Sequence, residues 1–326
     1  MTPRTYNWLV IGSRVLALVT RIAINTADLL IHPRITAVVT ADPELGWRFL
    51  GQRNQRELGF GDFVLRFDSL GLRQAEQTRE RLRDRVIFVG NSVTLGQQVG
   101  EEQTFAALLG GINAGGDGYD TYQQLTHFRR NLADLKPRRV VLVVVGVDLM
   151  TLAASQVRRR TTTAENPDLA SWFHRLTDIR NARIVLPNLM QAPMPTKPDN
   201  PHGDGAYLRA ATSKPTDSTW HDWSQAVADF SSTLGHGRLV LVLSPPRAQV
   251  AAWREGQPDS ALANVLAAFC AQHQIVCIDL LPYLANQDPT ALYVDHVHFS
   301  ARGHAAVAAA LRQSSLFDPA GQLSLP

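Results

Sequence analysis

Ser92 is the first residue whose setting suggests chemistry. It stands in VIFVGNSVTLGQQV, residues 86–99, where an apolar run ends in Gly90-Asn91-Ser92. A serine is a weak nucleophile unless a neighbouring base takes its proton. Serine is also a favoured helix N-cap residue, and in this segment alone the cap is the better interpretation. The G-x-S-x-G elbow of the α/β-hydrolases is absent, since Thr94 occupies the position of its second glycine.

A second polar group, Asp295-His296-Val297-His298, lies far downstream. An aspartate three residues before a histidine can orient its imidazole, which then serves as the base for a serine. A metal site is the rival interpretation, built on Asp295, His296 and His298, but it requires a further ligand such as His202 or His304. These residues can also be ordinary polar loop residues.

A third group is the glycine-rich stretch from Gly115 to Gly118, which follows Asn113. Glycine N–H groups can approach and stabilise an oxyanion, although a glycine-rich loop alone is weak evidence. The stretch does not match a phosphate-binding P-loop, because no Lys-Ser/Thr pair follows it.

The elements that must position these residues follow an alternating pattern. Apolar, β-branched runs predict buried parallel strands at 85–89, 112–114, 139–145, 238–243 and 275–280. Helical patterns are predicted between them at 104–109, 121–135, 223–234, 260–272 and 301–312. This alternation predicts a parallel sheet with helices on both faces. In such sheets ligands bind beyond the carboxyl ends of the strands, where Ser92, Asp148, Ser244, Asp295 and His298 are placed.

The flanking regions are less regular. Residues 32–84 contain many glycines and one alternating strand pattern at 63–67, and residues 156–220 are expected to form an irregular insertion with one helix near 169–176. Residues 8–31 are apolar but contain Arg14, Arg21 and Asp28, spaced seven apart. They fit a helix packed on the domain, a helix on a membrane surface or a degenerate membrane anchor. The compartment, cytoplasmic or membrane-associated through this segment, stays open.

Composition excludes several other classes. In 326 residues, 45% hydrophobic and 19% charged side chains are typical of a globular protein. The densest basic run, Arg158 to Arg160, is short and lacks aromatic neighbours, so nucleic-acid binding is not expected. Two cysteines, Cys270 and Cys277, provide neither a disulfide framework nor a metal-ligand set.

Taken together, FVGNSVTLG, INAGGDGYDTYQQL, VVLVVVGVDL and DHVHFSARGH resemble the SGNH, or GDSL-like, hydrolase superfamily over about residues 85–312. PELGWRFL and LRFDSLGLR also resemble the lead-in of many bacterial members. The resemblance implies a flavodoxin-like three-layer α/β/α sandwich without a cofactor. It implies Ser92 as nucleophile, His298 as base, Asp295 as its orienting acid, and the N–H groups of Ser92 and Gly118 as oxyanion donors.

Two positions depart from the family pattern. Asn91 stands where the first block has Asp, and Asp148 stands where the third block has an oxyanion-binding Asn. An ionised Asp148 would repel an oxyanion, and a lost donor costs roughly 10²–10³ in rate. Three outcomes are open: Asp148 is protonated by burial, Asn91 supplies the amide donor in exchange, or activity is weak or lost.

These observations predict an N-terminal helix at 1–31, a lead-in at 32–84, a hydrolase domain at 85–314 with an insertion at 156–220, and a tail at 315–326. The expected function is serine esterase activity on a small-molecule or glycan O-acyl ester. By analogy with the family, a small acyl group on a carbohydrate is the first substrate expected. The alternatives are an O-acyltransferase and a weakly active or non-catalytic binding protein. Trp172, Trp220 and Trp223 fit a sugar platform, although packing within the insertion is the better interpretation.

Overall fold

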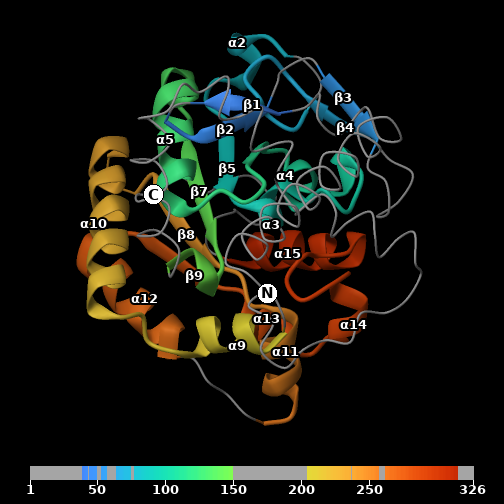
Figure 1. Ribbon diagram of the computed structural model, residues 1–326, viewed down its shortest axis with the longest axis vertical. Coiled ribbons are helices and arrows are strands. Elements are labelled where there is room, and N and C mark those ends of the chain that lie inside the picture. Colours follow the sequence, from blue (N-terminus) through green and yellow to red (C-terminus); the bar gives the residue numbers. More distant parts are fainter. Residues whose placement is uncertain are drawn as a thin grey trace, which may run out of the picture.

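A five-stranded parallel sheet lies at the centre of the protein (Figure 1). The computed structural model describes residues 39–42, 44–49, 53–56, 64–74, 77–149, 204–235, 237–256 and 261–314. The strands are β5 (Val86–Gly90), β6 (Ile112–Gly115), β7 (Arg139–Val144), β8 (Leu239–Leu243) and β9 (Val276–Asp279). Their order, β6-β5-β7-β8-β9, is the flavodoxin-like order 2-1-3-4-5 and confirms the predicted sheet.

Alternate residues of each strand feed two separate cores, as the two-residue period of a strand requires. Ile87 and Leu142 point to one core, while Phe88 and Val143 point to the other. The first core is covered by α5 (Thr121–Asn131), α10 (Asp217–Leu234) and α12 (Ala261–His273). The second is covered by α3 (Ser92–Leu95), α4 (Phe105–Leu108), α11 (Arg247–Arg254), α13 (Leu281–Leu284), α14 (Pro289–Leu292) and α15 (Ala301–Gln313). The three-layer α/β/α sandwich is therefore confirmed.

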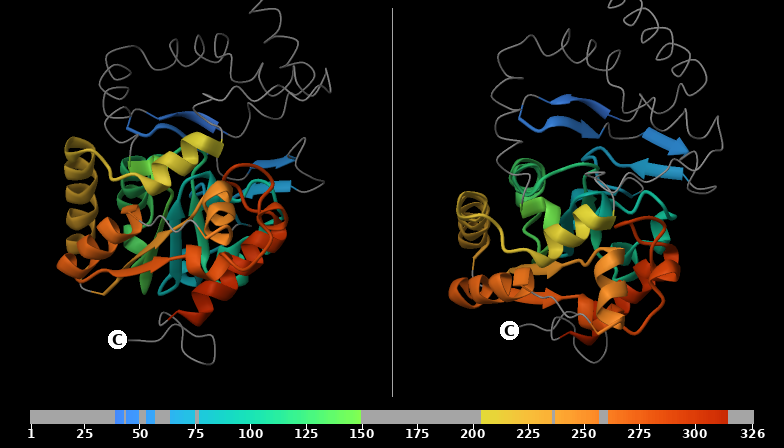
Figure 2. Two further views of the ribbon diagram at one scale, coloured as in Figure 1. Left: turned by 90° about the horizontal axis from the view of Figure 1, so that it is seen from below. Right: turned by 60° about the horizontal axis from the view of Figure 1, so that its bottom comes forward.

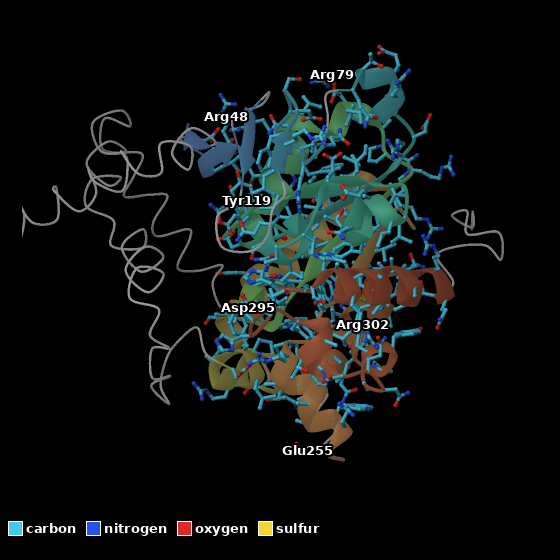
Figure 3. All side chains as sticks on the ribbon, turned by 90° about the vertical axis from the view of Figure 1, so that its right-hand side faces the viewer. Arg48, Arg79, Tyr119, Glu255, Asp295 and Arg302 are labelled. Atoms are coloured by element: carbon cyan, nitrogen blue, oxygen red, sulfur yellow. The ribbon has the colours of Figure 1, made fainter. Side chains whose placement is uncertain are left out.

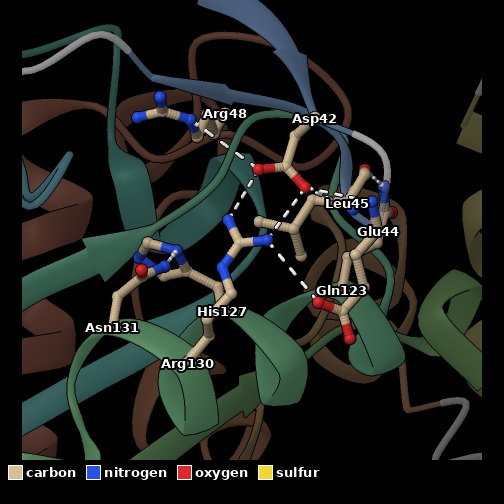
Figure 4. Close-up of polar contacts among 8 residues, drawn as sticks. All are labelled: Asp42, Glu44, Leu45, Arg48, Gln123, His127, Arg130 and Asn131. Atoms are coloured by element: carbon tan, nitrogen blue, oxygen red, sulfur yellow. Dashed lines mark hydrogen bonds and ion pairs between the residues drawn. The ribbon is translucent and has the colours of Figure 1, made fainter. Parts of the chain in front are cut away.

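The lead-in segment is more regular than its sequence indicated. It forms two small antiparallel sheets, β1 (Val39–Asp42) with β2 (Gly46–Phe49) and β3 (Arg53–Arg56) with β4 (Val64–Phe67), followed by α2 (Arg79–Leu82). Figure 4 shows how β1 is attached to α5: the two terminal guanidinium nitrogens of Arg130 donate to the carboxylate of Asp42, at 3.0 and 2.6 Å. Two backbone N–H groups also donate to Asp42 Oδ1. The nearly buried carboxylate is thereby fully partnered, which ties the lead-in to the sandwich.

The last part of the expected irregular insertion is helical instead. α9 (Asp204–Thr212) lies within it, and α10 begins at Asp217, ahead of the expected start at residue 223. α9 is short and weakly amphipathic, so its packing rather than its sequence period stabilises it. Figure 2 shows α9 in yellow beside α11 in light orange. The helix expected at 169–176, the segment 8–31 and the tail 315–326 lie outside the described residues, and the domain boundaries stay a prediction.

Within the part of the chain that the structure describes, no helix combines the length and apolarity needed to cross a membrane.

Candidate active site

Ser92 begins a helix but does not cap it. The N-cap of α3 is Asn91, whose Oδ1 accepts a hydrogen bond from the Val93 N–H at 2.9 Å. The neighbouring residue therefore satisfies the open helix end, which leaves the Ser92 hydroxyl available for another contact. This hydroxyl lies 2.8 Å from Nε2 of His298.

Two glycines allow α3 to lie close to the ends of β5 and β6. A Cβ atom at Gly90 would lie 2.1 Å from Oγ1 of Thr94. A Cβ atom at Gly115 would lie 2.2 Å from the backbone nitrogen of Leu95. Since real Cβ atoms do not approach so closely, glycine at both positions lets the helix that carries Ser92 pack directly on the sheet.

The loop between α14 and α15 carries the histidine and its aspartate. Oδ2 of Asp295 lies 2.7 Å from Nδ1 of His298, while Oδ1 accepts the backbone N–H groups of Val297 and His298 at 2.9 and 2.8 Å. Burial alone would raise the pKa of Asp295, but the hydrogen bonds and charge of His298 outweigh it and hold the pKa at about 2. An ionised Asp295 thus fixes the imidazole with Nε2 toward Ser92.

The nucleophile segment is also held from the lead-in. Arg73 is buried, and its guanidinium donates to the carbonyl oxygens of Leu95, Gly96 and Val99, which follow directly after Ser92 and its helix. The Leu95 carbonyl also accepts from the Asn113 amide at 3.3 Å, and the Gly96 carbonyl accepts from the Val99 N–H at 3.1 Å. Arg73 adds a donor to each of its three carbonyls and thereby joins the lead-in to the candidate site.

Asn91 and Asp148 face each other across neighbouring strands. Nδ2 of Asn91 donates to both carboxyl oxygens of Asp148, at 3.0 and 3.1 Å, and the Val145 N–H donates to Oδ2 at 2.9 Å. Asp148 is 3% exposed, and burial raises its pKa to about 7 even though these donors lower it. The reciprocal change in the sequence is therefore a direct side-chain contact beside Ser92, with a carboxyl that is neutral for part of the physiological pH range.

Gly118 lies in the loop between β6 and α5 with a φ of 66°. Its strand runs beside β5, with Gly115 opposite Gly90, so the loop leaves the same edge of the sheet as Ser92. Tyr119, the next residue, and Asp295 lie along the same side of the molecule in Figure 3. The structure thus brings Ser92, His298 and Asp295 into hydrogen-bond contact and places Gly118 at the same sheet edge.

The histidines of the alternative metal site do not lie together. His296 contacts Asp204 of α9, and His304 is fully buried, with Nδ1 accepting from the Phe105 N–H. Across the described ranges, no group of three or more His, Cys, Asp or Glu side chains is arranged to hold a metal ion. His202 lies outside these ranges.

Trp220 and Trp223 pack against the first core, as the preferred interpretation of their sequence expected. Trp223 is fully buried, stacks on Trp220 and contacts Phe269. Trp172 lies outside the described residues.

Sequence reasoning missed one polar cluster beside the histidine loop. Asp204 lies 2.7 Å from a guanidinium nitrogen of Arg247 and 3.0 Å from Nδ1 of His296. The Arg247 N–H also donates to the His296 carbonyl at 2.9 Å. No spacing in the sequence links Asp204 to these two residues, so only the fold reveals the contact.

A hydroxyl, an imidazole and a carboxylate linked in this order, at the carboxyl edge of a parallel sheet, have the geometry of a serine-hydrolase triad. The four motifs and the sheet order make the chain similar to the SGNH, or GDSL-like, hydrolases. No protein-family model matches the sequence, and no curated relative matches it.

Solved structures with a similar fold come from several bacteria. One is a lipase/acylhydrolase from Enterococcus faecalis, with 15% identity and a TM-score of 0.39, covering 69% of this chain and 92% of the other. Another is a member of the lipolytic protein G-D-S-L family from Veillonella parvula, with 14% identity and a TM-score of 0.37, covering 69% and 94%. A third is an acetyl xylan esterase from Geobacillus stearothermophilus, with 13% identity and a TM-score of 0.39, covering 70% and 92%. Similarity at this level does not define an activity or a substrate.

Proposed function

We propose that the protein is a serine esterase that hydrolyses O-acyl esters through Ser92, His298 and Asp295. The observation that carries the proposal is the continuous hydrogen-bond chain from Ser92 Oγ to His298 Nε2, at 2.8 Å, and from His298 Nδ1 to Asp295 Oδ2, at 2.7 Å. A hydroxyl next to an oriented imidazole is a nucleophile with its base in place. A helix-capping serine, or a chance contact between Ser92 and His298, would not require Asp295 behind the imidazole.

The reaction proceeds in two balanced steps. Ser92 Oγ attacks the ester carbonyl while His298 Nε2 takes its proton, and the carbonyl oxygen becomes an oxyanion that accepts from the Ser92 and Gly118 N–H groups. Collapse breaks the carbon–oxygen ester bond, and His298 returns the proton to the departing alcohol. Water then gives a proton to His298 and attacks the acyl-enzyme; the bond to Ser92 Oγ breaks, His298 returns the proton to Oγ, and the acid is released.

The Asn91–Asp148 pair determines the charge next to this oxyanion. A neutral Asp148 has one O–H to donate, and the Asn91 amide keeps one N–H beyond the one it gives to Asp148. Either group can provide a third donor. An ionised Asp148 adds a buried negative charge beside the developing oxyanion, so the protein with neutral Asp148 is the active form.

The substrate class rests on the resemblance to the SGNH hydrolases, many of which remove small acyl groups from polysaccharides. A small acyl group on a carbohydrate is therefore the first substrate to test. If another hydroxyl reaches the acyl-enzyme in place of water, the same triad acts as an O-acyltransferase.

The proposal is tested with p-nitrophenyl acetate and a fluorophosphonate probe that labels activated serines. Ser92→Ala is expected to abolish labelling and reduce turnover by at least about 10³-fold, because no other group takes the role of nucleophile. Ser232→Ala is the matched control, since Ser232 is an exposed serine on α10 that donates only to a carbonyl of its own helix.

Two results would overturn the proposal. Folded wild-type protein that is neither labelled nor active would favour a binding protein that keeps the fold. Activity that survives in Ser92→Ala and is lost to a chelator would favour a metal-dependent hydrolase.

A further inference from the structure

We infer that Tyr207, on α9, binds the alcohol portion of the ester through its hydroxyl group. This inference rests on the proposed esterase function and adds a specificity-determining residue outside the triad, the oxyanion donors and the four sequence motifs.

Both ends of α9 are fixed to the loops that form the site. At its N-terminal end, Asp204 pairs with His296, two residues before His298. At its C-terminal end, Ala210 is buried, and a Cβ atom at Gly146 would lie 2.5 Å from the Ala210 carbonyl oxygen. Gly146 in turn lies two residues before Asp148. The helix therefore extends from the histidine loop to the carboxyl end of β7, alongside α11 (Figure 2).

Tyr207 lies between these two contacts along α9. It follows Asp204 by three residues and precedes Ala210 by three, so it neighbours each of them on the helix surface. Its side chain thus leaves the helix between the histidine loop and the β7 end. In agreement, burial and the negative charges of Asp295 and Asp148 raise the pKa of Tyr207, so the phenol stays protonated and remains a donor.

The Tyr207 hydroxyl has no hydrogen-bond partner within the described part of the chain, while its ring packs partly buried against the second core. A tyrosine with a buried ring and an unengaged hydroxyl is suited to contact a ligand, because the ring is already ordered and the polar tip is available.

The mechanism assigns this position to the alcohol portion. His298 returns its proton to the departing oxygen, so the alcohol must lie against the His298 loop. α9 is attached to this same loop through Asp204 and His296. A carbohydrate alcohol offers ring and ester oxygens that accept from a phenol and an apolar face that packs on its ring.

The test compares Tyr207→Phe with wild type on two acetyl esters. Xylose tetraacetate has a carbohydrate alcohol with a ring oxygen and three further ester groups, whereas p-nitrophenyl acetate has neither of these beside its scissile ester. We expect KM for xylose tetraacetate to rise roughly fivefold to tenfold, as for the loss of one hydrogen bond, with kcat/KM for p-nitrophenyl acetate within about twofold of wild type. Tyr283→Phe is the control, because Tyr283 is an exposed tyrosine on α13.

Equal effects of Tyr207→Phe on both substrates, or none on either, would overturn the role of Tyr207 while leaving the esterase intact. Wild-type activity on p-nitrophenyl acetate without any on xylose tetraacetate would overturn the carbohydrate alcohol at this position. A wild type that hydrolyses neither ester and escapes the fluorophosphonate probe would overturn the proposed function itself, and the role of Tyr207 with it.

Discussion

Exchanging Asn91 and Asp148 is expected to remove a pH dependence that the wild-type pair imposes. In wild type, burial raises the pKa of Asp148 from 3.8 to about 7, which corresponds to roughly 4 kcal/mol in favour of the neutral form. The ionisable groups that act on Asp148 are Asp120, at the start of α5, and Tyr207 on α9. Neither supplies a positive charge to hold Asp148 ionised.

The sign of the effect follows from the raised pKa. Below about pH 6 Asp148 is neutral, and above about pH 7 the neutral fraction falls about tenfold per pH unit. If the neutral form is the active one, kcat/KM should decline by about 50-fold between pH 7 and pH 9, because half of the protein is neutral at pH 7 and about 1% at pH 9. The same group makes the fold less stable as pH rises from about 4 to 7, because over this range the carboxyl ionises in the unfolded chain but keeps its proton in the folded protein.

In the double variant Asn91→Asp/Asp148→Asn the donor at position 148 is an amide, which does not titrate. The carboxylate introduced at position 91 still has one oxygen for the Val93 N–H and another for the amide introduced at position 148. We therefore expect the decline above pH 7 to disappear. The assay is kcat/KM for p-nitrophenyl acetate from pH 5 to 9, corrected for spontaneous hydrolysis. Asp134→Asn, at an exposed carboxylate, is the control.

The reasoning is refuted if the wild type keeps constant activity up to pH 9, or if the folded exchange variant shows the same alkaline decline. Asn91→Ala separates the two donors. Full activity in this variant would show that the Asn91 amide is not the third donor.

Three further substitutions test the packing around the site. Gly115→Ala places a Cβ atom 2.2 Å from the Leu95 nitrogen, so we expect a loss of about 1–3 kcal/mol in unfolding free energy and a lower kcat. An unchanged kcat would contradict this close packing. Trp223→Phe removes the 3.0 Å hydrogen bond to Thr121, so urea unfolding should show a loss of about 1–2 kcal/mol in unfolding free energy. The kcat/KM for a glycan ester should stay the same, and a raised KM would support the sugar platform instead. Arg73→Met removes the buried guanidinium donors from the carbonyls of Leu95, Gly96 and Val99. Thermal melting should then show a loss of roughly 2–4 kcal/mol, whereas an unchanged Tm would mean that the lead-in does not hold the nucleophile segment.

The sheet could be predicted because its strands are buried on both faces. VIFVG, RVVLVV and LVLVL are continuous apolar runs that only a strand covered by two helix layers can bury, and all of them are buried. Short helices gave no comparable signal. α11 begins after Pro246 with mixed polarity, and α9 has only nine residues, so both depend on tertiary contacts rather than on their own sequence period.

The site could be predicted in part for a similar reason. Asp295 and His298 are three residues apart in one loop, and Ser92 follows a recognisable strand by two residues, so sequence and topology together place them at one edge. The contacts of Arg73 with α3, of Asp42 with Arg130, and of Asp204 with His296 join residues without any shared local pattern. Such pairs become visible only when the chain is folded.

Asn and Asp can exchange places at positions 91 and 148 without a change in the fold. An N-cap needs one side-chain oxygen, and Asn and Asp both provide it, so the Val93 N–H is satisfied by either residue. The contact between positions 91 and 148 needs one amide and one carboxyl, and it forms in either order. Stability at acid pH, where the buried carboxyl keeps its proton in both the folded and the unfolded chain, therefore distinguishes the two arrangements weakly. They differ in where the carboxyl lies: at the N-cap it is stabilised by helix N–H groups, whereas at position 148 it is buried and kept neutral. The consequence of the exchange is then a change in the pH range of activity rather than in the fold.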